Sequence, residues 1–407
     1  MFRARALLPL VLSLHAFLGV APVPAAVAAT PAAEVRRAPQ PPAWTAKIDK
    51  LIGRRPFGVA VREGKRFLYR AHDVMQRIPA SNEKLLMSMA LLDTLGPESR
   101  ILTQAASVPL VAGVIPGDLW ILGQGDPDTG PAQMQKLAAA IQAAGVVQIE
   151  GSVNGSTGYF KRDWRAPGWK PYFPREEVAL PTALTFEDNI AKGIHIRDPE
   201  LRAARSLSDA LKELGIKVGG KAGAGKPPEG LLPVAQVQSR RLLDILEFTN
   251  RYSVNFYAEV LGKRLGAERL GVPGSIAKGA TAMREWAAEQ GVHLRARDSS
   301  GLSYDNRLSP AGLVRLLGGA EAEAWGEAFR ESLPRPGQGT LEGRMRHLQV
   351  RAKTGTLTGI SALSGWVFLR REGVWAEFSI LSKGMDKAQA MRIEDAVVRV
   401  LARSATL

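Results

Sequence analysis

The sequence contains no cysteine and only five histidines among its 407 residues. Without cysteine, the chain can form no disulfide, thiol nucleophile or cysteine-ligated metal site. The histidines show no H-E-x-x-H or other paired spacing, which argues against a zinc hydrolase. A Ser-His-Asp triad would need one distant histidine of this set, which comprises His15, His72, His195, His293 and His347. We therefore expect no cysteine-ligated metal and no zinc-hydrolase centre, and stability that comes from core burial alone.

Beyond the N-terminus, the sequence also lacks apolar runs long enough to cross a membrane. At the N-terminus, two arginines precede an apolar run from Leu7 to about Val20, and an A-x-A sequence follows at 26–28. This order predicts a cleaved signal peptide over residues 1–29, with a retained membrane anchor as the alternative. The Pro- and Ala-rich residues 30–44 predict a linker. We expect an exported protein of the periplasm or cell envelope.

Acidic residues are outnumbered, with 54 Lys and Arg against 39 Asp and Glu, for a net charge of +15. A basic excess favours nucleic acid, an anionic membrane or an anionic cell-wall polymer as partner. Export favours the last two, so we predict no nucleic-acid partner. The arginines are dispersed and not interleaved with aromatic residues, so an ordinary solvated basic surface remains an equal alternative.

The two ends of the chain predict one antiparallel sheet. Alternating apolar residues indicate a β-hairpin over 57–70 and further strands from Lys353 to Leu381. A helix is predicted to begin at 79–81 and to end at Leu95, before Gly-Pro. An amphipathic helix is expected to close the chain over residues 386–402.

The middle of the chain predicts an insertion of mixed α/β type. Strands are expected at 118–122 and 146–153, and helices at 131–144 and 201–214. A connector rich in Gly, Pro and Lys follows at 217–233 and suggests a boundary. A long helical stretch then begins near Arg240 and is expected to break near residues 251–253.

Three short motifs follow one another along the chain. They are Ser81-x-x-Lys84, Ser253-x-Asn255 and Lys353-Thr354-Gly355. Each is weak alone, because Ser275-x-x-Lys278 and Ser152-x-Asn154 show the same patterns in the wrong order or context. Lys353-Thr-Gly occurs once, at the start of a predicted strand, and Ser81 stands at a predicted helix start.

These residue types suit nucleophilic catalysis. A serine hydroxyl needs an adjacent base to attack a carbonyl, and Lys84 lies one helical turn from Ser81 on the same face. Burial and the nearby charge of Lys353 would lower the pKa of Lys84 and make it a base. Ser253 could relay a proton to the leaving nitrogen, while Asn255 could hold Lys84 and a substrate amide.

The third motif suits substrate binding. Lys353 and Thr354 could hold an anionic substrate end, and Gly355 would let the strand approach closely. The backbone N–H groups of Ser81 and Thr356 could form an oxyanion hole. Taken singly, ordinary roles remain open: a helix cap for Ser81, a solvated lysine for Lys84 and a helix–helix turn for residues 253–255. Taken together and in order, the motifs favour catalysis.

The motif set resembles that of penicillin-binding proteins and serine β-lactamases. The resemblance is closer to the class C low-molecular-mass penicillin-binding proteins, a D-alanyl-D-alanine carboxypeptidase/endopeptidase family. It extends over segments 79–86, 117–127, 166–169, 298–303 and 351–365. It implies an α+β penicilloyl-serine transferase fold, a central antiparallel sheet with helices and an inserted smaller α/β domain. It also implies peptidoglycan stem peptides as substrate, β-lactam antibiotics as inhibitors and no cofactor.

On this basis we predict a catalytic domain of residues 45–105 and 235–407, with an inserted domain over 106–234. Two positions depart from the family pattern: Val254 replaces the commoner Asn or Asp, and Tyr304 stands where the family often has Arg. The departure at Tyr304 leaves the side-chain specificity for the stem peptide open. A serine β-lactamase and a non-catalytic wall-binding protein of the same fold are the alternatives.

Overall fold

The computed structural model describes residues 42–370 and 372–404 of the chain. These residues belong to one compact unit. The predicted signal peptide (1–29) lies outside the described residues, as does all but the end of the predicted linker (30–44). None of the described helices is both long and apolar enough to span a membrane.

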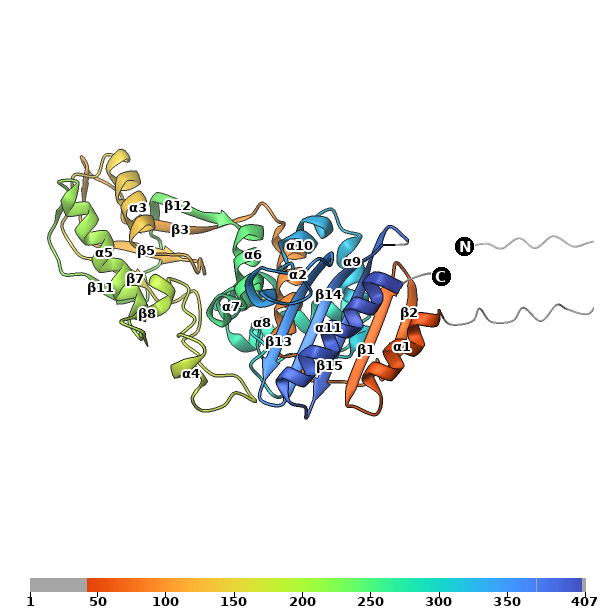
Figure 1. The fold of residues 1–407 in the computed structure, drawn as a ribbon. Coiled ribbons are helices and arrows are strands. Elements are labelled where there is room, and N and C mark those ends of the chain that lie inside the picture. Colours follow the sequence, from red (N-terminus) through yellow and green to blue (C-terminus); the bar gives the residue numbers. More distant parts are fainter. Residues whose placement is uncertain (1–41, 371, 405–407) are drawn as a thin grey trace, which may run out of the picture. The chain divides into compact units, whose positions relative to one another are not determined.

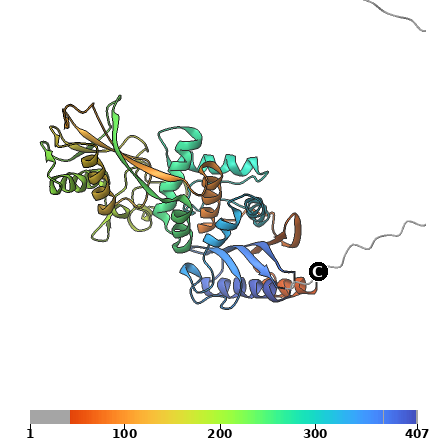
Figure 2. The same ribbon diagram turned by 90° about the horizontal axis from the view of Figure 1, so that it is seen from above.

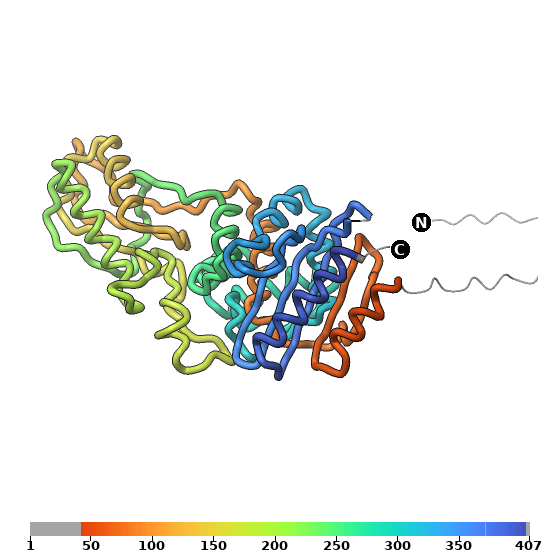
Figure 3. Tube along the Cα trace, in the orientation of Figure 1, coloured from red at the N-terminus to blue at the C-terminus, as the bar shows by residue number. Residues whose placement is uncertain are grey.

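One five-stranded antiparallel sheet is built from both ends of the described chain, as the sequence predicts (Figure 1). Its order is β13 (Val350–Leu357), β14 (Ile360–Leu369), β15 (Val374–Lys383), β1 (Phe57–Glu63) and β2 (Arg66–Ala71). Phe57 pairs with Ser382, and the tube in Figure 3 shows these early and late strands side by side. Because β13 has a strand neighbour on one side only, it is an edge strand of the sheet.

Helices cover both faces of this sheet, as Figure 2 shows. On one face lie α1 (Ala43–Ile52) and α11 (Lys387–Ser404), which share a core with Phe378 and Ile380 of β15. A second core gathers further helices around Trp366 of β14. They are α2 (Glu83–Leu95), α6 (Leu242–Tyr252), α7 (Asn255–Leu270), α8 (Ile276–Glu289), α9 (Pro310–Glu321) and α10 (Gly326–Ser332).

Two features of these helices position the motifs. Helix α2 begins after the 3-10 turn η1 (Ala80–Asn82) and is buried over most of its length, so its start is fixed by packing on several sides. The break predicted near 251–253 is confirmed, because α6 ends at Tyr252 and Ser253 takes a left-handed conformation with φ 59° and ψ 39°. This turn projects Ser253 from the junction of two helices.

The segment between α2 and α6 forms a mixed sheet with two helices, α3 (Pro131–Ala143) and α5 (Pro199–Glu213), packed together. The sheet order is β11 (Gly223–Gly225), β7 (Val153–Ser156), β5 (Leu119–Gly123), β3 (Arg100–Ser107) and β12 (Leu232–Arg241). Smaller sheets contain β4 (Val114–Ile115), β6 (Gln148–Ile149) and β10 (Lys217–Val218), and β8 (Ile190–Ala191) with β9 (Ile194–His195). A short helix, α4 (Phe173–Glu176), lies in the chain segment between β7 and β8.

Two predictions for this segment are wrong in detail. The strand expected over 146–153 is two short strands in different sheets, and between them the chain at Gly151 passes so close to Gly117 that no side chain would fit. The expected connector, 217–233, contains two short strands and the beginning of β12. Since β3 and β12 pair along their length, we propose that the insertion spans 100–241, wider than the predicted 106–234.

Candidate active site

Ser81 and Lys84 meet at the start of α2. Ser81 belongs to η1, and Nζ of Lys84 lies 3.3 Å from its Oγ. The Ser81 side chain caps neither η1 nor α2. Its hydroxyl therefore has a lysine partner in place of the ordinary helix-cap role.

The backbone of Ser81 is enclosed by two glycines. Gly301 has φ 85°, and a Cβ there would collide with the carbonyl oxygen of Ala80. A Cβ on Gly355 would lie 3.1 Å from the Ser81 nitrogen. Ala80 itself has φ 47°, a conformation that costs free energy for a residue with a side chain. This strained turn brings the Ser81 peptide against β13.

Lys84 is completely buried. Besides Ser81, its Nζ contacts Oδ1 of Asn255 at 2.8 Å and the carbonyl oxygen of Ser300 at 2.6 Å. Burial lowers the pKa of Lys84 from near 10.5 to about 8, because the charged form loses its hydration. Nearby carboxylates, Asp298 foremost, oppose this shift and favour the ammonium form.

Three buried acids surround Lys84, and sequence reasoning did not identify them as part of the site. Asp298 accepts two backbone N–H groups and three side-chain donors, and Glu259 accepts two backbone N–H groups of the same loop. Burial raises the pKa of Glu83 well above its usual range and that of Glu259 to about 7. The raised pKa favours the neutral form of Glu83, which limits the negative charge that would keep Lys84 protonated.

Lys353 and Ser253 form the second pair of the site. Nζ of Lys353 donates to Oγ of Ser253 at 2.8 Å and to the carbonyl oxygen of Thr354 at 2.9 Å. Burial lowers the pKa of Lys353 well below its usual range, and the charges of Lys84 and Lys387 lower it further. Burial is thus the main cause of the lowered pKa for both motif lysines, and the repulsion that the sequence predicts for Lys84 acts on Lys353 instead.

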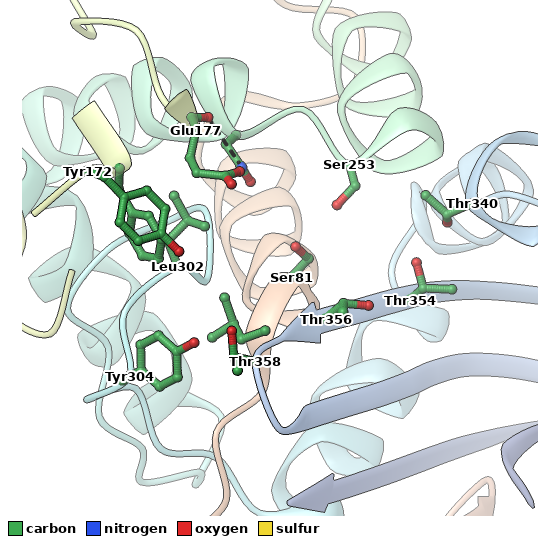
Figure 4. Close-up of a pocket in the computed structure, with 13 residues that line it drawn as sticks. Ser81, Tyr172, Glu177, Ser253, Leu302, Tyr304, Thr340, Thr354, Thr356 and Thr358 are labelled. Carbon is green, nitrogen blue, oxygen red and sulfur yellow. Dashed lines mark hydrogen bonds between the residues drawn. The ribbon is translucent and has the colours of Figure 1, made fainter. Parts of the chain in front are cut away.

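A cavity of about 350 Å³ opens above these residues (Figure 4). Figure 4 shows Ser81 in its middle, Thr354, Thr340 and Ser253 on one side, and Tyr172, Leu302 and Tyr304 on the other. The lining also contains Phe173, Glu177, Asn255, Thr356, Leu357 and Thr358. Four lining residues, Tyr172, Phe173, Glu177 and Thr340, lie outside every motif and every segment of the family resemblance, so no sequence pattern marked them. Among residues 42–370 and 372–404, no cluster of acidic or histidine side chains is placed to hold a metal ion.

This geometry accompanies a clear relationship to known proteins. Residues 46–192 and 180–404 match the D-Ala-D-Ala carboxypeptidase 3 (S13) family. The chain belongs to this family. A carboxypeptidase of Mycobacterium tuberculosis is 30% identical, over 89% of this chain and 83% of that protein. A D-alanyl-D-alanine carboxypeptidase of Actinomadura sp. is 27% identical, over 83% of this chain and 79% of that protein.

Solved structures share the fold. Penicillin binding protein 4 of Haemophilus influenzae has a TM-score of 0.76 at 19% identity, and the match covers 88% of this chain and 99% of that one. A predatory peptidoglycan endopeptidase of Bdellovibrio bacteriovorus has a TM-score of 0.55 at 15% identity, with 85% and 92% covered. The predicted family, fold class and enzyme class are therefore confirmed: the chain is a serine D-Ala-D-Ala carboxypeptidase of the S13 family.

In this S13 enzyme, a polar network of Lys387, Ser361 and Glu394 contacts the backbone of β13 at Gly355. Nζ of Lys387 lies 2.9 Å from Oγ of Ser361 and 3.4 Å from the carbonyl oxygen of Gly355. Ser361 in turn donates to Glu394, which is buried. The Gly355 carbonyl and the Thr356 N–H belong to one peptide unit, so Lys387 contacts the group that presents the Thr356 N–H.

The two competing motif matches have structural roles elsewhere in the S13 fold. Oγ of Ser275 accepts the backbone N–H of Lys278 at 3.1 Å and caps α8. Ser152 and Asn154 both donate to the carboxylate of Asp118 in the inserted segment. None of these four motif residues lines the cavity around Ser81.

Proposed function

We propose that this S13 enzyme is exported and cleaves peptidoglycan stem peptides, as carboxypeptidase and endopeptidase, through an acyl-enzyme on Ser81. The observation that supports this most is the set of three oxygens around Nζ of Lys84. A neutral amine has two N–H groups and one lone pair. The two shorter contacts, to Asn255 and Ser300, suit the N–H groups, and the longer contact leaves the lone pair for the Ser81 hydroxyl.

Acylation follows from this arrangement. Oγ of Ser81 attacks the carbonyl carbon of the D-Ala–D-Ala bond while Lys84 takes its proton. The negative charge that develops on the carbonyl oxygen would be held by the N–H groups of Ser81 and Thr356. The close approach of Gly355 to the Ser81 nitrogen supports this pairing of N–H groups. Collapse of the intermediate breaks the C–N bond and leaves an ester on Ser81.

The leaving amine needs a proton, which Ser253 could deliver. Its hydroxyl lines the cavity and is bonded to Lys353 behind it, so a proton given up by Ser253 can be replaced from Nζ. The terminal carboxylate of the substrate would meet the hydroxyl of Thr354, on the side of the cavity that Thr340 also lines. The Thr340 hydroxyl is buried and has no partner among the described residues.

Deacylation uses the same groups in reverse order. Before this step Lys84 returns its proton to solvent and Lys353 regains one. Water then attacks the ester carbonyl, Lys84 takes a proton from this water, and the same proton passes to Oγ of Ser81 as the ester C–O bond breaks. We expect β-lactam antibiotics to acylate Ser81 as inhibitors, because their ring amide opens without releasing a separate leaving group.

A non-catalytic wall-binding role is disfavoured, because Ser81, Lys84 and Lys353 are all present and in contact with their expected partners.

Mass spectrometry after treatment with benzylpenicillin tests the proposal. We expect the adduct on the peptide that contains Ser81, and its loss in Ser81→Ala, a change that typically costs about 10⁴–10⁶ in rate. Ser275→Ala is the matched control and should still be acylated. An adduct on Ser275, or none in the wild type, contradicts the assignment. Rapid release of penicilloic acid from the wild type would favour the β-lactamase alternative.

A further inference from the structure

A second cavity of about 580 Å³ adjoins the catalytic one. Both are lined by Tyr172, which therefore stands between them. The lining of the second cavity consists of Trp164, Arg165, Pro171, Tyr172, Pro174, Arg175 and Arg197. It contains three arginines and no acidic residue. Its volume lies in the range of about 300–1,000 Å³ that is common for ligand sites.

The charge of these arginines is largely unpaired within the described part of the chain. Arg165 and Arg197 are exposed and form no ion pair there, and Arg175 has one long contact, 3.7 Å to Glu176, between two exposed side chains. Such a contact is worth little. A fourth cation, Nζ of Lys170, lies 5.9 Å from the centre of the Tyr172 ring. A further positive charge thus lies beside the residue that both cavities share.

The walls of the cavity are held by contacts of their own. Nε1 of Trp164 donates to the carbonyl oxygen of Val178 at 2.8 Å, and the Arg197 guanidinium lies 5.6 Å from the Trp164 ring centre. Nδ1 of His195 lies 2.8 Å from the carbonyl oxygen of Pro174, which ties this loop to β9. Guanidinium groups beside fixed aromatic faces suit a carboxylate attached to an extended peptide.

The order of residues across the catalytic cavity determines which part of a substrate would reach the second cavity. Figure 4 places Thr354 and Thr340 on one side of Ser81 and Tyr172 on the opposite side. If the terminal carboxylate lies at Thr354, the acyl part of the peptide extends towards Tyr172 and onwards into the second cavity. We propose that the second cavity is an extended subsite that binds a carboxylate on the acyl side of the stem peptide. This inference rests on the proposed function.

Two matched peptides test the subsite. Both end in D-Ala-D-Ala and contain an upstream γ-linked D-glutamyl residue, with its α-carboxylate free in one and amidated in the other. We expect the kcat/KM of the wild type to be about tenfold higher for the free acid, because amidation removes the charge-assisted hydrogen bonds between this carboxylate and the arginines. The double variant Arg165→Gln/Arg197→Gln should lose this preference. Arg399→Gln, which removes an exposed arginine from α11, should keep it.

The outcomes separate this inference from the proposed function. Equal rates for both peptides in the wild type, or a preference that persists in the double variant, would overturn the subsite. Binding of soluble polyglycerol phosphate is measured as well. If the double variant loses affinity for this polymer while its peptide selectivity stays unchanged, the subsite is overturned and the cavity is assigned to a phosphate polymer. Acylation by benzylpenicillin should stay within about twofold in all variants, since a small β-lactam does not reach past Tyr172. Failure of the wild type to react with benzylpenicillin would instead refute the proposed function.

Discussion

Lys353 donates a hydrogen bond to Oγ of Ser253, although no part of the lysine side chain is exposed to solvent. The sequence predicts that Lys353 binds the anionic end of the substrate directly. In the structure, the hydroxyls of Ser253, Thr354 and Thr340 line the cavity, and the lysine lies behind them. Since burial lowers the Lys353 pKa well below its usual range, we infer that an incoming carboxylate shifts Lys353 towards its charged form. Substrate binding would then prepare the proton that Ser253 delivers.

The acylation rate should rise with pH through the pKa of Lys84, about 8. Lys84 works as a base only when neutral, so its active fraction grows with pH and reaches a plateau above this pKa. Below it, the rate should fall by about tenfold for each pH unit. Stopped-flow acylation by a chromogenic penicillin between pH 5.5 and 9.5 measures this profile. Lys84→Arg should be inactive, because a guanidinium keeps its proton; substantial activity in this variant would place the base elsewhere.

Glu177 should shift the pH dependence of the acylation rate. Its charge raises the pKa of Lys84, and it lines the cavity beside Asn255. Glu177→Gln removes the charge, so the half-maximal point of the acylation profile should move to lower pH. Glu176→Gln is the control, because Glu176 is a neighbouring exposed acid outside the cavity lining. An unchanged midpoint in Glu177→Gln, or an equal change in both variants, would show that Glu177 does not act on Lys84.

The order of the three motifs allowed the centre of the site to be predicted. Ser81, Lys84, Ser253, Asn255 and the residues from Lys353 to Thr356 are distant in sequence, yet local patterns placed each at a helix start, a helix break or a strand. The sheet from both chain ends was predictable for the same reason, because alternation of apolar residues is a local property. The structure then brings these local elements together.

What remained unpredicted depends on contacts between distant segments. Glu83 and Glu259 look like ordinary helix acids, and only packing shows that both are buried beside Lys84. Thr340 and Tyr172 come from loops that no motif marks. Helix α1 was also missed, although Trp44, Ile48 and Ile52 recur at intervals of four residues; its start lies within a segment that composition marks as a linker.

Lys387 should support the oxyanion hole without touching substrate. Its contact with the Gly355 carbonyl polarises the peptide unit that presents the Thr356 N–H. Lys387→Met should therefore lower the acylation rate by about tenfold, less than the loss of an oxyanion donor itself. A purely structural role would lower thermal stability and leave the rate per folded molecule unchanged, so both are measured. Lys383→Met, at the exposed end of β15, is the control and should change neither.

Thr354 should determine the preference for a free terminal carboxylate. Its hydroxyl lines the cavity on the side of Ser81 opposite Tyr172, where the leaving residue of a carboxypeptidase substrate would lie. A charge-assisted hydrogen bond there is worth roughly 1.5–3 kcal/mol. Amidation of the terminal carboxylate should therefore lower kcat/KM of the wild type by about one to two orders of magnitude, since each 1.4 kcal/mol is about tenfold.

Thr354→Val keeps the shape of the side chain and removes the hydroxyl, so it should narrow the gap between free-acid and amidated D-Ala-D-Ala peptides. It should also slow acylation by penicillin in parallel, because the penicillin carboxylate would use the same hydroxyl. Thr358→Val is the matched control, since Thr358 lines the cavity near Tyr304, away from Thr354. Equal rates for acid and amide in the wild type would mean that this side of the cavity does not bind the carboxylate. Carboxypeptidase action would then give way to cleavage of cross-linked peptides, in which the residue after the scissile bond has no such requirement.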